Sequence, residues 1–157
     1  MEEVLNMYKK IINNKNEMKD FGYRLAEILK NGDVLSLVGG MGAGKTTLTQ
    51  FIGEGLDIKE YITSPTFSIV QSYQGKKEIN HIDLYRIEDA RELESIDMDQ
   101  YLYPEGITII EWASRAPEYM PRNKMDIFID SIDEEKREIR IEGKNNWEQK
   151  LIKELEI

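Results

Sequence analysis

A glycine-rich stretch a quarter of the way along the chain has the residue types and spacing of a phosphate-binding loop. Residues 39–46 read GGMGAGKT, so that Gly39 is followed after four residues by Gly44, Lys45 and Thr46. Glycines let the backbone curl until several N–H groups point at one anion, and the N-terminus of the following helix adds its dipole. A lysine here reaches the β- and γ-phosphates, and the adjacent hydroxyl ligates Mg²⁺. The stretch therefore predicts a nucleotide site with magnesium.

The sequence on either side of this loop predicts the strand and helix that such a loop requires. Residues 33–40 are a short apolar run bounded by glycine, which indicates a buried strand, and residues 45–56 have the pattern of a helix. A dinucleotide-binding fingerprint is excluded, because counting from Gly40 puts Lys45 where its last glycine is required. The positions that we assign to nucleotide binding in this region are Gly40, Met41, Gly42, Ala43, Gly44, Lys45, Thr46 and Thr47.

Two acidic residues stand at the ends of apolar segments, where a phosphate-loop enzyme needs a carboxylate to hold the metal or to orient water. Glu111 ends the run ITIIE, and we expect it to act with Thr46 on Mg²⁺. Asp83 ends EINHID and suits the orientation of the attacking water, so we assign catalysis to Asp83 and Lys45. A solvated strand-end carboxylate is the alternative for each acid. His81, the only histidine, is expected on the same strand face as Asp83 and is more often structural in such a position.

The composition limits the class of protein. The 157 residues are enough for one domain, and 40% hydrophobic with 32% charged residues is ordinary for a globular protein. A net charge of −9 disfavours non-specific binding of DNA or RNA, because an acidic surface repels a phosphate backbone. The chain has no cysteine, which excludes disulfides and thiolate chemistry. No apolar run reaches the ~18 residues of a membrane span, and we expect a cytoplasmic protein without a membrane or DNA as partner.

The remaining segments predict an α/β fold, a single P-loop NTPase-like domain whose mixed parallel and antiparallel sheet is flanked by helices. Two hairpins are expected, one from residues 66–85 around a glycine-containing turn and one from residues 125–143 around an acidic turn. The other expected strands are residues 8–14, 33–40 and 106–112, and the expected helices are residues 16–32, 45–56, 87–102 and 145–157. We assign residues 1–142 to the ATPase domain and residues 143–157 to a helical tail packed on it.

Residues 123–126, NKMD, match the Asn-Lys-x-Asp signature with which GTPases hold guanine. In those proteins the signature follows a buried strand, whereas here it precedes the expected strand IFID. The chain also has no aspartate that is followed three residues later by glycine, as the GTPase switch requires. We interpret NKMD as a coincidence and expect adenine to be preferred over guanine.

Four segments occur in an order and at spacings that resemble the TsaE family (also called YjeE), small bacterial ATPases required for threonylcarbamoyladenosine on tRNA. The segments are the phosphate loop, SPTFSIVQSY at 64–73, HIDLYRI at 81–87 and IIEWASRAPEYMP at 109–121. The resemblance extends over about residues 5–142. Departures are small: Met41 replaces a usual leucine, Ala113 often differs, and residues 95–102 lack a glycine that is common there.

The resemblance implies that the phosphate loop serves ATP or ADP with Mg²⁺, that Asp83 acts in hydrolysis and that Glu111 coordinates Mg²⁺. It also implies that Thr66 senses the γ-phosphate from a switch-like loop. Trp112 would lie near the nucleotide, and a core indole at a strand end is the alternative for this residue.

Partners are also implied by the resemblance. Proteins of this family act with TsaB and with TsaD, which carries threonylcarbamoyl transfer to position 37 of tRNA, and ATP hydrolysis resets that complex between rounds. A chain with a net charge of −9 that contacts mainly protein, while the partners hold the tRNA, agrees with this role. The arginines that are open candidates for a tRNA-facing patch are Arg86, Arg91, Arg115 and Arg122, of which Arg86 and Arg115 are also candidates for stabilising charge in catalysis.

Two other functions stay open beside an ATPase subunit. A small-molecule kinase uses the same loop with an arginine-bearing lid, which residues 114–122 could supply. A nucleotide-binding switch would bind tightly without turnover. The hairpin expected over residues 66–85 is less typical of a kinase, and the motifs favour the ATPase subunit.

Overall fold

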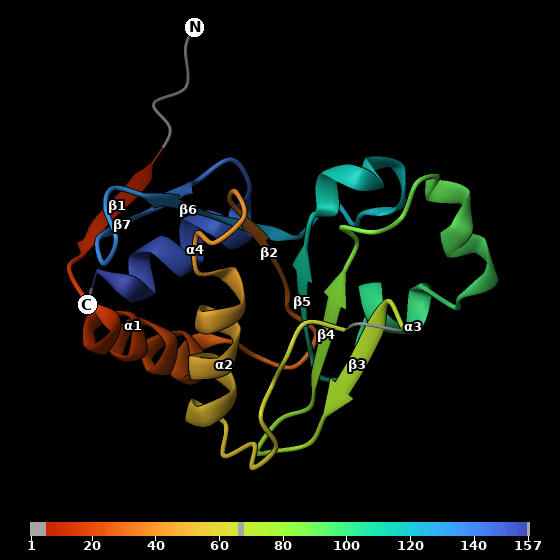
Figure 1. Cartoon of the computed structure of the whole chain (residues 1–157), viewed down its shortest axis with the longest axis horizontal. Helices are drawn as coiled ribbons and strands as arrows, with labels where there is room; N and C mark the ends of the chain where they lie inside the picture. Colours follow the sequence, from red (N-terminus) through yellow and green to blue (C-terminus); the bar gives the residue numbers. More distant parts are fainter. Residues whose placement is uncertain (1–5, 66–67, 157) are drawn as a thin grey trace, which may run out of the picture.

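The computed structural model describes residues 6–65 and 68–156, which form a seven-stranded sheet with helical segments on both faces. The strand order is β1-β7-β6-β2-β5-β4-β3, with β1 and β3 at opposite edges (Figure 1). The strands are β1 (Met7–Ile12), β2 (Val34–Val38), β3 (Val70–Tyr73), β4 (Ile79–Asp83), β5 (Ile107–Glu111), β6 (Met125–Ser131) and β7 (Arg137–Glu142). The α-helices are α1 (Lys15–Ile28), α2 (Lys45–Gly55), α3 (Asp99–Leu102) and α4 (Asn146–Leu155).

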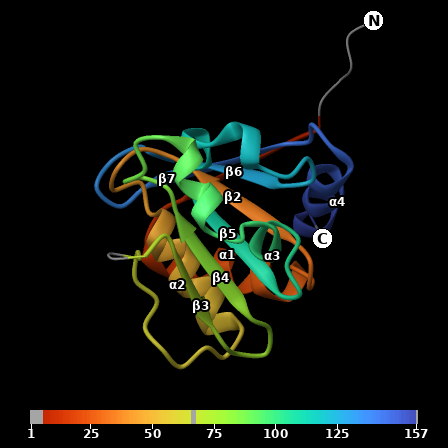
Figure 2. The same ribbon diagram turned by 90° about the vertical axis from the view of Figure 1, so that its right-hand side faces the viewer.

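The pairing is mixed, as the sequence predicts. The central strand β2 is parallel to both β5 and β6, and β4 is parallel to β5. Both expected hairpins are present as the antiparallel pairs β3–β4 and β6–β7, and β1 pairs antiparallel with β7. Figure 2 shows β2, β5, β4 and β3 side by side. Because β2, β4 and β5 run in the same direction, the segments that follow them meet at one edge of the sheet.

Two apolar clusters cover the two faces of the sheet. The alternation of side chains along a strand separates them: Leu35 and Leu37 of β2 face the cluster with α1, α2 and α4, whereas Val34 faces the other. The second cluster is closed by α3 and by the short 3₁₀ turns around it. No helix among the described residues is long and apolar enough to cross a membrane.

The prediction of one continuous helix over residues 87–102 is wrong. A 3₁₀ turn spans Ala90–Ser95 and α3 begins only at Asp99, with extended backbone at Ile96 (φ −116°, ψ 139°) between them. Leu93 and Met98 are both buried in the second cluster, although residues five apart in a continuous helix point about 140° away from each other. An extended residue between them lets both side chains reach the sheet, so tertiary packing overrides the local helical pattern.

The C-terminal helix α4 packs on β6, β7 and α1. Its start is capped by the Asn145 side chain, which accepts a hydrogen bond from the Glu148 N–H at 2.8 Å. Leu151 and Ile152 are buried in the same cluster as α1, and the Glu148 carboxylate accepts a hydrogen bond from the Asp126 N–H at 3.0 Å. The segment after residue 142 therefore shares the main core, while its assignment as a unit separate from residues 1–142 stays a prediction.

Helices α1 and α2 approach closely at a glycine, and this contact sets a testable requirement. A Cβ added at Gly22 would lie 2.6 Å from the Cβ of Phe51 and 3.2 Å from its carbonyl carbon. We expect Gly22→Ala to lower the free energy of unfolding by about 1–3 kcal/mol, because overpacking outweighs the gain in helix propensity. Urea unfolding measures the change. Asp20→Ala, at an exposed position of α1, should stay within about 0.5 kcal/mol of the parent, and an equally stable Gly22→Ala would contradict the tight contact.

Candidate functional site

The segment from Gly39 to Gly44 connects β2 to α2, in the order that a phosphate loop requires. Gly42 and Gly44 have φ of +75° and +107°, which side chains with a Cβ rarely adopt. Gly39 is required for a different reason, because a Cβ there would lie 2.5 Å from the Ile129 carbonyl oxygen of β6. Three of the four loop glycines are therefore required, Gly42 and Gly44 by backbone conformation and Gly39 by the close approach of a neighbouring strand, whereas a Cβ at Gly40 would meet nothing within 4 Å.

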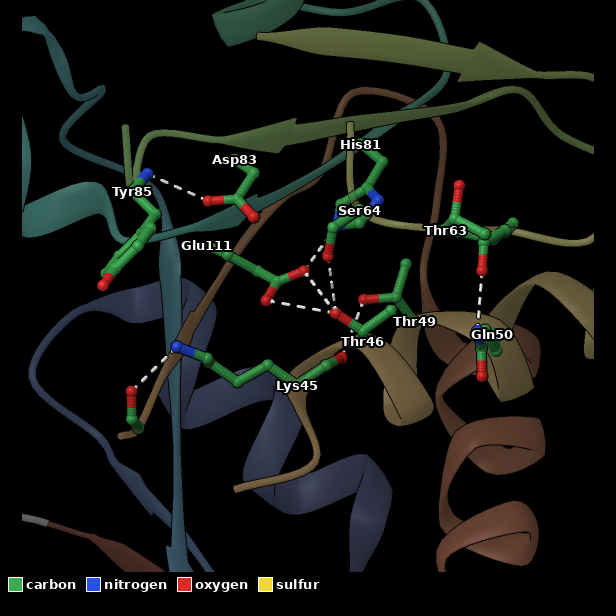
Figure 3. A network of polar contacts seen from close by, with 12 residues as sticks. Lys45, Thr46, Thr49, Gln50, Thr63, Ser64, His81, Asp83, Tyr85 and Glu111 are labelled. Atoms are coloured by element: carbon green, nitrogen blue, oxygen red, sulfur yellow. Dashed lines mark hydrogen bonds and ion pairs between the residues drawn. The ribbon is translucent and has the colours of Figure 1, made fainter. Parts of the chain in front are cut away.

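Lys45 is the first residue of α2 and is only 6% exposed. Its ammonium donates a hydrogen bond to the Gly39 carbonyl at 2.8 Å (Figure 3). The ammonium also lies 3.8 Å from the centroid of the Trp112 ring. Burial lowers the pKa of Lys45, whereas the nearby carboxylates of Glu111 and Asp83 act in the opposite direction. The side chain thus lies across the loop, where its charge is available to an anion held there.

Thr46 and Glu111 come together at the start of α2. The Thr46 hydroxyl donates to Glu111 Oε2 at 3.2 Å and lies 3.0 Å from the Ser64 hydroxyl (Figure 3). Glu111, at the end of β5, is 3% exposed. Hydroxyl and carboxylate oxygens are ligands that Mg²⁺ prefers, and Mg²⁺ usually takes few ligands from protein and the rest from phosphate and water. The described residues hold no group of three or more acids and histidines that could bind a metal ion by itself, and the Thr46–Glu111 pair fits a magnesium site completed by a nucleotide.

His81 is the residue that orients Glu111. It lies on β4 with its side chain fully buried, and its Nε2 is 2.5 Å from Glu111 Oε2. Its Nδ1 has no hydrogen-bond partner among the described residues. The sequence predicts the shared face of His81 and Asp83 but not the partner of the imidazole, because that partner comes from the neighbouring strand β5.

Asp83 ends β4 directly beside Glu111 in the parallel register. Its Oδ1 accepts a hydrogen bond from the Tyr85 N–H at 2.9 Å, which fixes the direction of the half-buried carboxylate (Figure 3). Burial raises the pKa of Asp83, and the Tyr85 hydrogen bond opposes this shift. The carboxylate therefore stands in place to accept a hydrogen bond at the edge of the loop.

Trp112 follows β5 in a left-handed backbone conformation, with φ 61° and ψ 38°. Among the described non-glycine residues only Asp57 shares a positive φ. The unusual conformation turns the indole toward Lys45, and the Tyr85 ring packs against it at a centroid distance of 5.1 Å. The Arg115 guanidinium lies 5.5 Å from the centroid of the Tyr85 ring.

A cavity of about 680 Å³ opens at the phosphate loop and brings most of the predicted residues together. The predicted residues that line it are Met41, Gly42, Ala43, Gly44, Lys45, Thr46, Thr47, Asp83, Glu111 and Trp112. Arg86 lines it as well, whereas Gly40 and Arg115 do not. The predicted residue Thr66 lies outside the described residues.

Ser64 and Arg137 are among the lining residues that were not assigned from the sequence. Ser64 belongs to the SPTF motif, so the motif itself is the signal that could have identified it. Arg137 follows the acidic turn, far in the sequence from every motif, and no local pattern distinguishes it from a surface arginine.

The NKMD segment lies away from this cavity, as the sequence argument expects. Its last two residues begin β6, at the edge of the sheet where the parallel strand β2 begins, whereas the phosphate loop follows the end of β2. The Lys124 ammonium donates to Asp126 Oδ1 at 2.7 Å, so these two side chains bind each other. The preference for adenine stays a prediction.

The family model described as "Threonylcarbamoyl adenosine biosynthesis protein TsaE" matches residues 12–139. The chain belongs to the TsaE family. The TsaE protein of Bacillus subtilis (strain 168), named as a tRNA threonylcarbamoyladenosine biosynthesis protein, is 38% identical over 143 residues, which cover 90% of this chain and 89% of that protein. The TsaE of Nostoc sp. (strain PCC 7120) bears the same name and is 39% identical over 141 residues, or 86% of this chain and 85% of its own.

The fold of this TsaE-family chain matches a solved structure closely. The crystal structure of Bacillus subtilis YdiB superposes with a TM-score of 0.81 at 32% sequence identity, covering 99% of this chain and 97% of that one. The family resemblance and the P-loop NTPase-like fold that the sequence predicts are both confirmed.

The contact between Lys45 and Trp112 predicts a fluorescence signal. The chain has two tryptophans, and Trp147 lies in α4, away from the cavity. In a Trp147→Phe variant, MgADP should change the emission of Trp112, because a phosphate group that attracts the Lys45 ammonium alters the charge above the indole. A Trp112→Phe variant is the matched control and should show no change. Identical responses of the two variants would contradict the position assigned to Trp112.

Proposed function

We propose that this TsaE-family chain is a Mg²⁺-dependent ATPase subunit that acts in threonylcarbamoyladenosine modification of tRNA at position 37. The observation that supports it most is the meeting of Lys45, the Thr46–Glu111 pair and Asp83 around one cavity at the phosphate loop. The names of the Bacillus and Nostoc relatives support the tRNA pathway. A protein of this pathway works where tRNA is modified, in the cytoplasm.

The loop and Lys45 form the proposed phosphate site. The cavity of about 680 Å³ is in the size range of small-molecule sites. Lys45 gives its hydrogen bond to the Gly39 carbonyl, and a phosphate oxygen would replace that carbonyl as the acceptor. The exchange favours a charged acceptor, because hydrogen bonds between ionised groups are roughly twice as strong as neutral ones. Thr66 remains a proposed contact to the γ-phosphate.

Thr46 and Glu111 are the proposed residues for Mg²⁺, with His81 holding the carboxylate in place. When bound there, Mg²⁺ would neutralise charge on the phosphoryl oxygens. Asp83 lies one strand away with its carboxylate oriented by the Tyr85 N–H. We assign to it the hydrogen bond that directs the attacking water toward the phosphate.

The proposed partners are TsaD and TsaB, with tRNA contacted mainly through that complex. The net charge of −9 supports this arrangement, because the chain itself would repel a phosphate backbone. We expect slow hydrolysis by the isolated chain, since a charge-stabilising group supplied by a partner is worth about 10³–10⁵ in phosphoryl-transfer rate.

Phosphate release from ATP, measured for the chain alone and with a purified TsaD–TsaB pair, tests the proposal. A slow rate that rises when the pair is added supports a partner-gated ATPase. If the pair neither binds nor changes the rate, the function is wrong as stated, and transfer of phosphate to a small molecule becomes the reaction to assay.

Lys45→Ala tests the phosphate site. We expect the variant to lose at least the ~1.5–3 kcal/mol of a charge-assisted contact, which weakens ATP binding by tenfold or more and abolishes turnover. Titration calorimetry with ATP measures the change. Lys59→Ala, at an exposed position outside the cavity, is the control and should bind as the parent does. ATP affinity and turnover that survive Lys45→Ala would refute the loop assignment.

Asp83→Asn separates hydrolysis from binding. The amide keeps an oxygen for the Tyr85 N–H but has no negative charge to hold the attacking water, so we expect ATP affinity within a few-fold of the parent and a turnover lowered by about 10²-fold or more. Asp97→Asn, an exposed carboxylate, should leave both unchanged. Loss of nucleotide binding with an intact fold would instead place Asp83 among the residues that hold the metal.

A further inference from the structure

Arg137, the first residue of β7, contacts the phosphate loop at Ala43, which is 94 residues away in the sequence. Its Nε donates a hydrogen bond to the Ala43 carbonyl at 2.9 Å, and one terminal nitrogen, Nη2, donates to the Gly42 carbonyl at 3.5 Å. A Cβ added at Gly44 would lie 3.9 Å from Arg137 Nε, so the guanidinium also packs against the last glycine of the loop.

The other end of the same guanidinium is held by the turn between β6 and β7. Nη1 donates to the carbonyls of Asp133 at 2.8 Å, Lys136 at 3.0 Å and Glu134 at 3.3 Å. The turn is itself ordered by the Asp133 carboxylate, which accepts the N–H groups of Glu135 at 2.9 Å and Lys136 at 2.8 Å. The planar fork of the arginine thus joins two loops that have no strand pairing with each other.

The loop geometry gives this contact a consequence for phosphate binding. A phosphate loop works when its N–H groups point together at the anion, and its carbonyls then need partners elsewhere. The Arg137 guanidinium donates hydrogen bonds to two of these carbonyls, those of Gly42 and Ala43, and it also lines the cavity. A cation bound to the loop carbonyls both holds the peptide groups in this orientation and adds positive charge near the phosphates.

We propose that Arg137 is a positioning residue that braces the phosphate loop in its anion-binding conformation through the Gly42 and Ala43 carbonyls. This inference rests on the proposed function, because it concerns the same phosphate site. A lysine cannot replace the arginine, since a point charge on a flexible stem cannot bridge both loops.

The variants Arg137→Lys and Arg137→Gln test this bracing contact between Arg137 and the phosphate loop, called the brace below, by two measurements. Amide hydrogen exchange of residues 40–47 in the nucleotide-free protein should become faster in both variants, while exchange in α1 and β5 stays as in the parent. Affinity for ATP should fall about tenfold in both, which corresponds to the loss of a charge-assisted hydrogen bond. If Arg137 contributed only to overall stability, its variants would instead change amide hydrogen exchange throughout the sheet and lower the melting temperature, with no larger effect on the loop.

Arg140→Lys is the matched control on the same strand. The Arg140 guanidinium pairs with Asp130 and Glu142 at 3.5 and 3.4 Å and lies over the Phe128 ring, and none of these residues lines the cavity. It should change neither loop exchange nor ATP affinity.

The outcomes distinguish the brace from the function on which it rests. If the parent binds ATP, Lys45→Ala does not, and the Arg137 variants match the parent in affinity and loop exchange, the brace is wrong and the function stands. An Arg137→Lys variant that behaves as the parent while Arg137→Gln does not would also overturn the brace, because charge alone then suffices. If the parent itself fails to bind ATP, the proposed function fails, and loop exchange still decides whether Arg137 orders the loop.

Discussion

The parallel register of β2, β5 and β4 is the constraint on which the site depends. Leu37 pairs with Glu111 and Glu111 pairs with Asp83, so three strands end almost level at one edge of the sheet. The phosphate loop leaves β2 just beyond Leu37, which brings Lys45 and Thr46 over the two carboxylates. Since side chains alternate along a strand, a slip of one residue would turn either carboxylate to the opposite face. The register therefore sets the geometry of the chemistry.

Several charged or polar groups are buried in one place, and their arrangement makes this possible. The Lys45 ammonium, the Glu111 carboxylate and the His81 imidazole are nearly removed from water, which is costly unless each finds a partner. Glu111 finds donors in Thr46 and His81, and Lys45 finds the Gly39 carbonyl and the indole face of Trp112. These partners hold the groups in place without a nucleotide. The hydrogen bond from the Lys45 ammonium to the Gly39 carbonyl is one that a bound anion can replace.

Much of this arrangement follows from short stretches of sequence. The phosphate loop, the two hairpins and the acids at strand ends were all predicted, because each depends on a few neighbouring residues and on the periodicity of one segment. The prediction of one helix over residues 87–102 was wrong because the structure of that segment depends on distant residues. Its local pattern is helical, but Leu93 and Met98 must both reach the sheet, and that demand comes from residues distant in the sequence.

The sequence by itself determined the chemistry that is available: a loop for phosphate, an ammonium, a hydroxyl and two carboxylates, since residue type and spacing along one chain are enough to identify them. Only the tertiary structure decided which of these groups meet. The pairing of His81 with Glu111 depends on the neighbouring strand, and the contact of Arg137 with Ala43 depends on β7, which lies beyond β6 in the sheet. Contacts between separate elements carry no local signal, because they depend on strand order and register and not on the residues beside them.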